Sequence, residues 1–256
     1  MNANKVNVMS VKNCSLCASG GNSAHNRVPL TERPTTIIDT CVSTRRLYVQ
    51  IALLFTLCTA ATSPAFACKF NPSASFQTEF TKPDPEWLPD GKLVYFANGQ
   101  LAIKPEPNTT VWRLYPSFNF KNATYCLDVK TPPEPVVPGT SSNAGLIFWR
   151  DTFDHFYLVT VYPDGNYAVS RASLDWTIVL PPTKFDKLNV GPGAVNEIKV
   201  VTLNDVVTLF FNGKKATEFR AQAPKAPNIA TRVGLFAQSS KDQTNEWRFL
   251  SLIVNE

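Results

Sequence analysis

The sequence predicts an all-β protein: a two-sheet antiparallel β-sandwich, preceded by a non-globular leader. Three observations support this prediction. Residues 145–171 have the pattern of three strands joined by two tight reversals. Elsewhere, short runs of aromatic and β-branched residues alternate with turns rich in Pro, Gly and Asn, as in sandwiches. Residues 68–256 sustain no helical period, so the core must be built from strands.

The stretch 145–171 organises the rest of the prediction. Pro163-Asp164-Gly165 separates its last two strands, because Pro presets φ for a turn and Gly takes positive φ without steric cost. Along the middle strand, the even-numbered residues 156–162 point to one face and the odd-numbered residues 157–161 to the other. Neither face is strongly polar. We therefore expect a central strand with one face in the core and the other lining a groove or a second layer.

The flanking elements are expected from turn chemistry. Asn98-Gly99, Asn204-Asp205 and Asn212-Gly213 are hairpin signals between apolar runs,. The Pro-rich segments 131–143 and 181–192 are expected as loops, since proline donates no ladder hydrogen bond,. The domain opens with a short strand near Phe76, and the further expected strands are 92–95, 100–104, 112–115, 123–130, 145–150, 156–162, 166–171, 176–180, 197–203, 206–211, 215–220, 232–239 and 247–254.

A secretory signal peptide is expected at 45–67. Arg45-Arg46 precedes an apolar run, and Ala65-Phe66-Ala67 precedes Cys68, which is the order of a basic region, an apolar region and an A-x-A cleavage site. The apolar run is too short and too rich in Thr for a membrane span. We expect 68–256 to form a single β-sandwich domain, exported to the periplasm or the extracellular space.

Residues 1–44 are polar and lack periodicity, so we interpret them as a disordered leader or as sequence upstream of a mis-assigned start,. Residues 44–48 also match a twin-arginine signal loosely, which leaves the export route open. The segment 1–67 holds six of the 25 Lys and Arg residues and two of the 20 acids. The remaining chain is therefore nearly neutral, which argues against a nucleic-acid partner.

The cysteines divide between the leader and the expected domain. Four of them, at positions 14, 17, 41 and 58, lie before the cleavage site at irregular spacing, and they do not match a zinc pattern. Cys68 and Cys126 remain. Two cysteines in an exported domain predict a disulfide. The alternative is that Cys68 is a lipoprotein cysteine, although the usual Leu three residues before it is missing,.

The motifs between 76 and 254 resemble the concanavalin A-like lectin/glucanase sandwiches, and within them most closely the 3-keto-disaccharide hydrolase-like (laminin G-like) bacterial domains. The resemblance implies a jelly roll with one concave sheet, and carbohydrate binding or turnover as a family tendency. It rests on Phe76, Phe80, Trp87, Gly145–Asp151, Tyr157, Pro163–Gly165, Tyr167, Arg171, Trp176, Gly193, Asn196, Ile198, Val200, Asn212, Gly213, Val233–Ala237, Trp247, Phe249, Leu252 and Val254.

No catalytic motif accompanies this resemblance. Related family 16 glycoside hydrolases carry Glu-x-Asp-x-Glu on one strand, which sets two carboxylates on one face, and this sequence has no such run. Asp151 and Asp154 lie in an expected turn, where Asp is common for conformational reasons,. His155 beside them is a weak candidate for a base. We predict no catalytic residue, metal or cofactor, while loop calcium stays open because its ligands leave little sequence trace.

Aromatic and arginine side chains near the central strands are the candidate binding residues. An aromatic ring beside a guanidinium or carboxylate suits a sugar, which has apolar C–H faces and polar hydroxyl rims. The alternative is that these rings only fill the core. The predicted ligand-binding residues are Trp149, Arg150, Asp151, Tyr157, Tyr167, Arg171 and Trp176.

Three functions are compatible with these residues. The first is an exported, non-catalytic sandwich that binds a carbohydrate or a cell-envelope component. The second is a hydrolase acting on 3-keto-disaccharides or related glycosides, with a site built from dispersed residues. The third is a structural or adhesion module without a small ligand, which the absence of an aromatic-lined groove would favour.

Overall fold

The computed structural model contains almost no helix. It describes residues 68, 72–115, 120–137, 139–151, 155–224 and 231–256. The predicted leader 1–44 and signal peptide 45–67 lie outside these residues. One 3₁₀ turn, Pro85–Trp87, accompanies strands β1 (Phe76–Thr78), β2 (Val94–Ala97), β3 (Gln100–Ile103), β4 (Thr110–Leu114), β5 (Ala123–Lys130), β6 (Asn143–Arg150), β7 (Phe156–Val161), β8 (Asn166–Ser173), β9 (Asp175–Lys184), β10 (Val195–Leu203), β11 (Val206–Phe211), β12 (Lys214–Arg220), β13 (Arg232–Gln238) and β14 (Trp247–Asn255).

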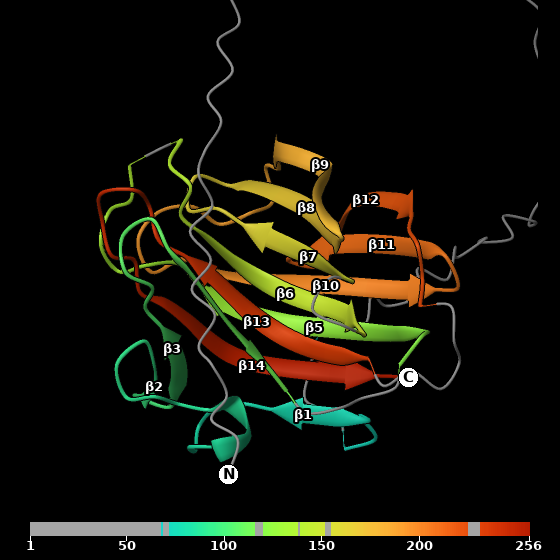
Figure 1. Cartoon of the computed structure of the whole chain (residues 1–256), viewed down its shortest axis with the longest axis horizontal. Coiled ribbons are helices and arrows are strands. Elements are labelled where there is room, and N and C mark those ends of the chain that lie inside the picture. The colour runs from blue at the N-terminus through green and yellow to red at the C-terminus, as the bar shows by residue number, and fades with distance from the viewer. Residues whose placement is uncertain (1–67, 69–71, 116–119, 138, 152–154, 225–230) are drawn as a thin grey trace, which may run out of the picture. The chain divides into compact units, whose positions relative to one another are not determined.

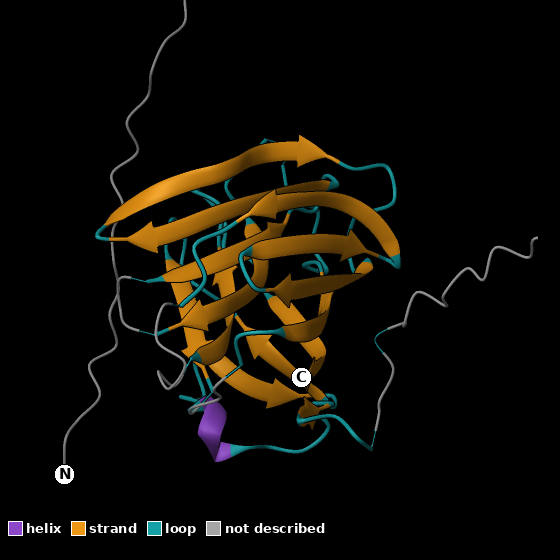
Figure 2. Cartoon of the chain, turned by 90° about the vertical axis from the view of Figure 1, so that its right-hand side faces the viewer, coloured by secondary structure: helices purple, strands orange, loops and turns teal. Residues whose placement is uncertain are grey.

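Two antiparallel sheets pack face to face (Figure 1). The eight-stranded sheet has the order β12-β11-β10-β5-β14-β3-β2, with β1 paired to β14. The six-stranded sheet has the order β4-β13-β6-β7-β8-β9. Figure 2 shows the curved strands of both layers and the loops at their ends. The predicted two-sheet antiparallel β-sandwich is confirmed.

The main core lies between the inner faces of the two sheets. Alternation along β7 sends Tyr157, Val159 and Val161 into this core, whereas Phe156 and Leu158 belong to a second apolar cluster on the outer face of the six-stranded sheet. This arrangement confirms the alternation expected for the strand, because successive side chains of a strand point to opposite faces.

Two hairpins form at the Asn-Gly dipeptides as expected. Asn98-Gly99 joins β2 to β3 with φ of 54° and 70°, and Asn212-Gly213 joins β11 to β12 with φ of 50° and 73°. Positive φ at both central residues matches the right-handed twist of the flanking strands, and Asn and Gly tolerate it best. Local sequence therefore sets these two reversals.

One strand differs from its prediction. We expected a strand at 176–180 followed by a loop from Pro181, but β9 continues through Pro181 and Pro182 to Lys184. The strand lies at the edge of the six-stranded sheet, where one side of the backbone needs no ladder donor and proline is tolerated. Its register shifts against β8 where these prolines lie.

A disulfide joins Cys68 to Cys126 on β5, with the two Cα atoms 5.4 Å apart, as the cysteine pattern predicted. Among the residues that the structure describes, no helix has the length and apolar character needed to cross a membrane.

Candidate functional site

A β-bulge at the end of β6 shapes the candidate site. Arg150 pairs with Arg232 of β13 and Ile147 pairs with Gly234, so that Phe148 and Trp149 together oppose Val233 alone. Trp149 has φ of 53°, which is uncommon for a bulky residue and costs about 1–3 kcal/mol. The extra residue turns Trp149 to the inner face beside Phe148, and both belong to the main core,.

The Trp149 ring is held from two sides. Its Nε1 donates a hydrogen bond to the carbonyl oxygen of Lys121 at 3.1 Å. The ring also packs edge-to-face with Tyr157, with ring centroids 5.9 Å apart at 81°. The Tyr157 hydroxyl accepts a hydrogen bond from the backbone N–H of Gln222 at 2.8 Å. These contacts fix two aromatic walls at one end of the sandwich.

Three polar side chains stand near these walls. Arg171 lies on β8 directly opposite Tyr157, and its Nε is buried without a hydrogen-bond partner among the described residues. Asp151 follows β6, and its Oδ1 lies 3.6 Å from Nδ1 of His155 at the start of β7. This is an ion pair whenever the imidazole is protonated. The Asp151 carboxylate follows β6 and the Arg171 guanidinium lies on β8, so the two groups flank Tyr157 on β7.

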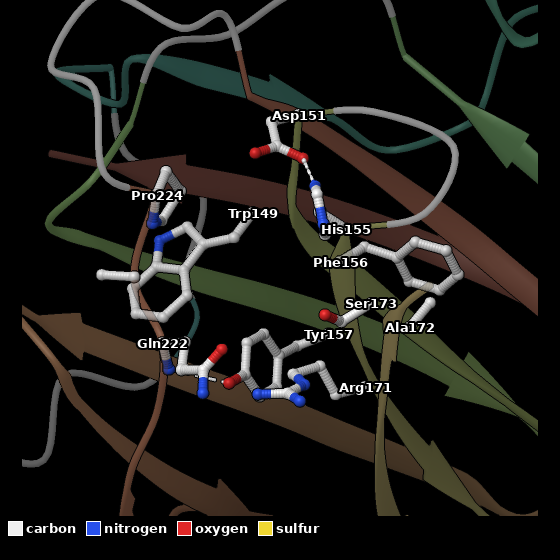
Figure 3. A pocket seen from close by; sticks show the side chains of 11 residues that line it. Trp149, Asp151, His155, Phe156, Tyr157, Arg171, Ala172, Ser173, Gln222 and Pro224 are labelled. Carbon is white, nitrogen blue, oxygen red and sulfur yellow. Dashed lines mark hydrogen bonds and ion pairs between the residues drawn. The ribbon is translucent and has the colours of Figure 1, made fainter. Parts of the chain in front are cut away.

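Together these groups line a pocket of about 390 Å³ at the ends of β6, β7, β8 and the segment after β12 (Figure 3). The Asp151–His155 pair stands on one side of it, and Tyr157, Arg171 and Gln222 on another. Its lining consists of Trp149, Asp151, His155, Phe156, Tyr157, Arg171, Ala172, Ser173, Gln222, Ala223 and Pro224.

The structure brings together Trp149, Asp151, Tyr157 and Arg171 of the predicted binding residues. Arg150 lies elsewhere: the bulge turns it to the outer face, where its guanidinium carbon is 5.6 Å from the ring centre of Trp112. Arg150 is 3% exposed and is absent from the pocket lining.

Tyr167 and Trp176 also lie outside the pocket. Tyr167 packs in the main core against Phe211, with ring centroids 4.8 Å apart. Trp176 on β9 is 54% exposed and meets Phe156 edge-on at 5.9 Å. Trp176 is therefore absent from the pocket lining, although it contacts Phe156, which belongs to that lining.

Sequence reasoning missed the contribution of residues 222–224. They follow β12 and reach the pocket from the other sheet, 65 positions from the Tyr157 hydroxyl that Gln222 contacts. No local motif marks this segment, because its role comes from the packing of the two sheets. His155 was considered as a base and does line the pocket.

The pocket suits a small polyhydroxylated ligand. Its volume falls within the range of ligand pockets, about 300–1,000 Å³. Arg171 supplies donors, Asp151 supplies acceptors, and the aromatic walls supply apolar contact, which is the combination that orients a ligand. No group of three or more His, Cys, Asp or Glu side chains capable of holding a metal ion occurs among the residues that the structure describes.

The two-sheet β-sandwich is similar in fold to solved structures of low sequence identity. Three solved structures illustrate the likeness. A structure from work on endo-acting O-glycanases of the human gut microbiota that initiate mucin breakdown has a TM-score of 0.52 and 10% identity, over 72% of this chain and 99% of that chain. LamAcat from Zobellia galactanivorans has a TM-score of 0.52 and 10% identity, over 72% of this chain and 98% of that chain.

The carbohydrate recognition domain of Emp46p, in a mutant form, has a TM-score of 0.51 and 10% identity, over 69% of this chain and 93% of that domain. Likeness at such identity shows a shared fold, and one fold hosts many functions. No protein-family model and no curated protein matches this sequence.

Proposed function

We propose that the chain is an exported β-sandwich that binds a carbohydrate in the pocket beside Trp149 without cleaving it. The observation that carries this proposal is the meeting of Arg171, Asp151 and two aromatic walls at one pocket of about 390 Å³. Solved structures of the same fold include a carbohydrate recognition domain and glycan-acting enzymes, which supports a carbohydrate as the ligand class.

The number of acids found in the pocket lining supports binding rather than hydrolysis. Glycoside hydrolysis generally needs two carboxyl groups on opposite sides of the scissile bond. Of the described residues, Asp151 is the one acid that lines the pocket. A single carboxylate orients hydroxyl groups but leaves the second role of such a mechanism unfilled.

The export part of the proposal rests on the sequence pattern at 45–67 and on the Cys68–Cys126 disulfide. Disulfides form and persist in oxidising compartments, which fits a periplasmic or extracellular location. The side-chain sulfur of Cys68 is engaged in this bond, which argues against a lipid thioether on the same atom.

A glycan array probed with the exported protein tests the binding proposal. Arg171→Ala is the informative variant, because Arg171 lines the pocket and its Nε has no hydrogen-bond partner among the described residues. Trp176→Ala is the matched control, because Trp176 is exposed and outside the pocket. We expect Arg171→Ala to abolish binding and Trp176→Ala to leave it unchanged.

Other outcomes would contradict the proposal. Loss of binding in Trp176→Ala alone would move the site to the outer face of the six-stranded sheet. Failure of the folded protein to bind any glycan would remove the function itself and leave a structural or adhesion module.

A second function, hydrolysis of 3-keto-disaccharides or related glycosides, is favoured by one contact. Asp151 lies 3.6 Å from His155, and an imidazole beside a carboxylate can act as a general base. Incubation of the protein with 3-keto-glucosides tests this function. Product formation that His155→Asn abolishes would replace the non-catalytic proposal.

A further inference from the structure

Residue 68, the first residue after the predicted cleavage site, is held on the outer face of the eight-stranded sheet. Its Sγ is bonded to Cys126 of β5. Its backbone nitrogen donates a hydrogen bond to Oε2 of Glu197 on β10 at 3.2 Å. Cys126 pairs with Lys199 two residues along β10, so both attachments of Cys68 reach the same pair of strands.

Glu197 lies in an acidic setting. It pairs directly with Asp128 across β5 and β10, and opposed residues of an antiparallel pair project their side chains to the same face. Like charges in this arrangement destabilise a sheet. The ion pairs found among the described residues include neither acid. Lys199, two positions along β10 on the same face, has its Nζ 5.4 Å from the ring centre of Phe210.

The Glu197 carboxylate is also incompletely satisfied. Its Oε1 is buried without a hydrogen-bond partner among the described residues, while Oε2 accepts one N–H from Cys68. A buried oxygen of a charged group that lacks a hydrogen bond bears the full desolvation cost of that oxygen. A peptide N–H offers a single donor, whereas an ammonium offers three donors and a positive charge.

We propose that Glu197 is a receptor for the α-ammonium group that cleavage of the Ala67–Cys68 bond creates. In that cleavage water adds its oxygen to the Ala67 carbonyl carbon, the C–N bond breaks, and the released Cys68 amine takes a proton. The new ammonium then donates to both oxygens of Glu197 and balances the charge of that carboxylate. Processing thus creates the ion pair that locks the mature N-terminus onto the sheet.

This inference rests on the export part of the proposed function and is independent of glycan binding. It also specifies the kind of processing. Cleavage at A-x-A leaves Cys68 with a free amine and its sulfur in the disulfide. Acylation of that amine, as in a lipoprotein, would remove the charge that Glu197 receives.

A double-mutant cycle on the exported full-length chain tests the proposal. One change inserts Ser-Gln between Ala67 and Cys68, so that cleavage after Ala67 leaves the ammonium two residues before Cys68 and no new A-x-A site precedes Cys68. The other change is Glu197→Gln, which keeps the size and removes the charge. Intact mass, measured with and without reductant, first establishes the N-terminus and the disulfide of each product.

We expect the wild-type product to begin at Cys68 and the insertion to lower Tm by about 3 °C or more, the size expected for roughly 1 kcal/mol in a chain of this length. In the Glu197→Gln background the insertion should have no effect. Glu218→Gln is the control, since Glu218 is an exposed acid of β12 paired with Lys215, and it should retain the full effect of the insertion.

Three results would overturn the proposal: a mature N-terminus other than Cys68, an equal effect of the insertion with and without Glu197, or an insertion that leaves Tm unchanged. If Glu197→Gln fails to fold, an unchanged Tm of the insertion in the wild-type background still overturns the proposal. None of these results depends on glycan binding, so a failure here is distinguishable from a failure on the array.

Discussion

Trp149 and Arg150 are consecutive residues of β6 whose side chains lie on opposite faces of the six-stranded sheet: Trp149 in the main core and Arg150 over Trp112 on the outer face. Alternation alone would have placed Trp149 on the same face as Ile147, which belongs to the outer cluster,. The β-bulge at Trp149, whose φ is 53°, places its side chain on the inner face instead. The pocket has its Trp149 wall because of that one backbone distortion.

Trp149 should matter for stability as much as for binding. The ring is 2% exposed, and truncation of a buried tryptophan costs about 3–5 kcal/mol. We expect Trp149→Ala to lower the urea midpoint strongly, whereas Trp176→Ala, at a ring that is 54% exposed, should lower it much less. Equal losses in the two variants would contradict the burial of Trp149.

Asn212 combines a turn conformation with three side-chain hydrogen bonds. Its Oδ1 accepts from the backbone N–H of Glu197 at 2.8 Å, and its Nδ2 donates to the Lys187 carbonyl at 2.6 Å and to Asn196 Oδ1 at 2.9 Å. Each such bond contributes about 1 kcal/mol. We therefore expect Asn212→Ala to lower the free energy of unfolding by about 3 kcal/mol beyond the strain of its positive φ.

Asn98 is the matched control for Asn212. It has φ of 54°, close to the 50° of Asn212, but lacks a comparable set of side-chain bonds among the described residues. Asn98→Ala should therefore cost only the backbone strain, about 1–2 kcal/mol. Urea unfolding of both variants measures the difference, and equal losses would show that the Asn212 bonds add nothing.

Asp90 should contribute to acid sensitivity. Burial by itself would raise the pKa of Asp90, but hydrogen bonds from the backbone N–H groups of Val94, Lys92 and Leu93 and the charge of Arg113 outweigh it and lower the pKa. A carboxyl group with a depressed folded-state pKa adds stability that is present above the unfolded value, about 3.9, and is lost as pH falls through the folded value.

Asp90→Asn should therefore reduce the loss of unfolding free energy between about pH 6 and pH 3. Urea titrations at the two pH values test this prediction, and an unchanged acid response in Asp90→Asn would contradict it.

Tyr95 should resist ionisation in alkali. Burial first, and then the hydrogen bond and charge of Glu246, raise the pKa of Tyr95 to about 12, with Oη 2.5 Å from Glu246 Oε2. Stability from this raised pKa is present below the unfolded value, about 10, and is lost as pH rises through the folded value.

At about pH 11 the tyrosinate absorbance of Tyr95→Phe should consequently equal that of the wild type, because Tyr95 is still protonated there. Glu246→Gln should lower the pKa of Tyr95 and add one ionising tyrosine to the curve. A smaller tyrosinate signal in Tyr95→Phe than in the wild type would disprove the predicted shift.

The sequence by itself determined the strands, their main turns and the two-sheet class. These features depend on residues close together in the chain: Asn212-Gly213 adopts its turn, and β7 alternates, whatever lies across the core,. The disulfide was also predictable, since Cys68 and Cys126 are the two cysteines left after the expected cleavage.

Only the tertiary structure decided which residues share the pocket. The face of Trp149 depends on a bulge opposite Val233 of β13, the passage of β9 through Pro181 depends on its edge position, and the contact of Gln222 with Tyr157 depends on how the two sheets close. The bulge and the Gln222 contact arise between strands that are distant in sequence, and the edge position of β9 is set by the order of the whole sheet. Packing between strands selects these features, so a local sequence pattern does not predict them.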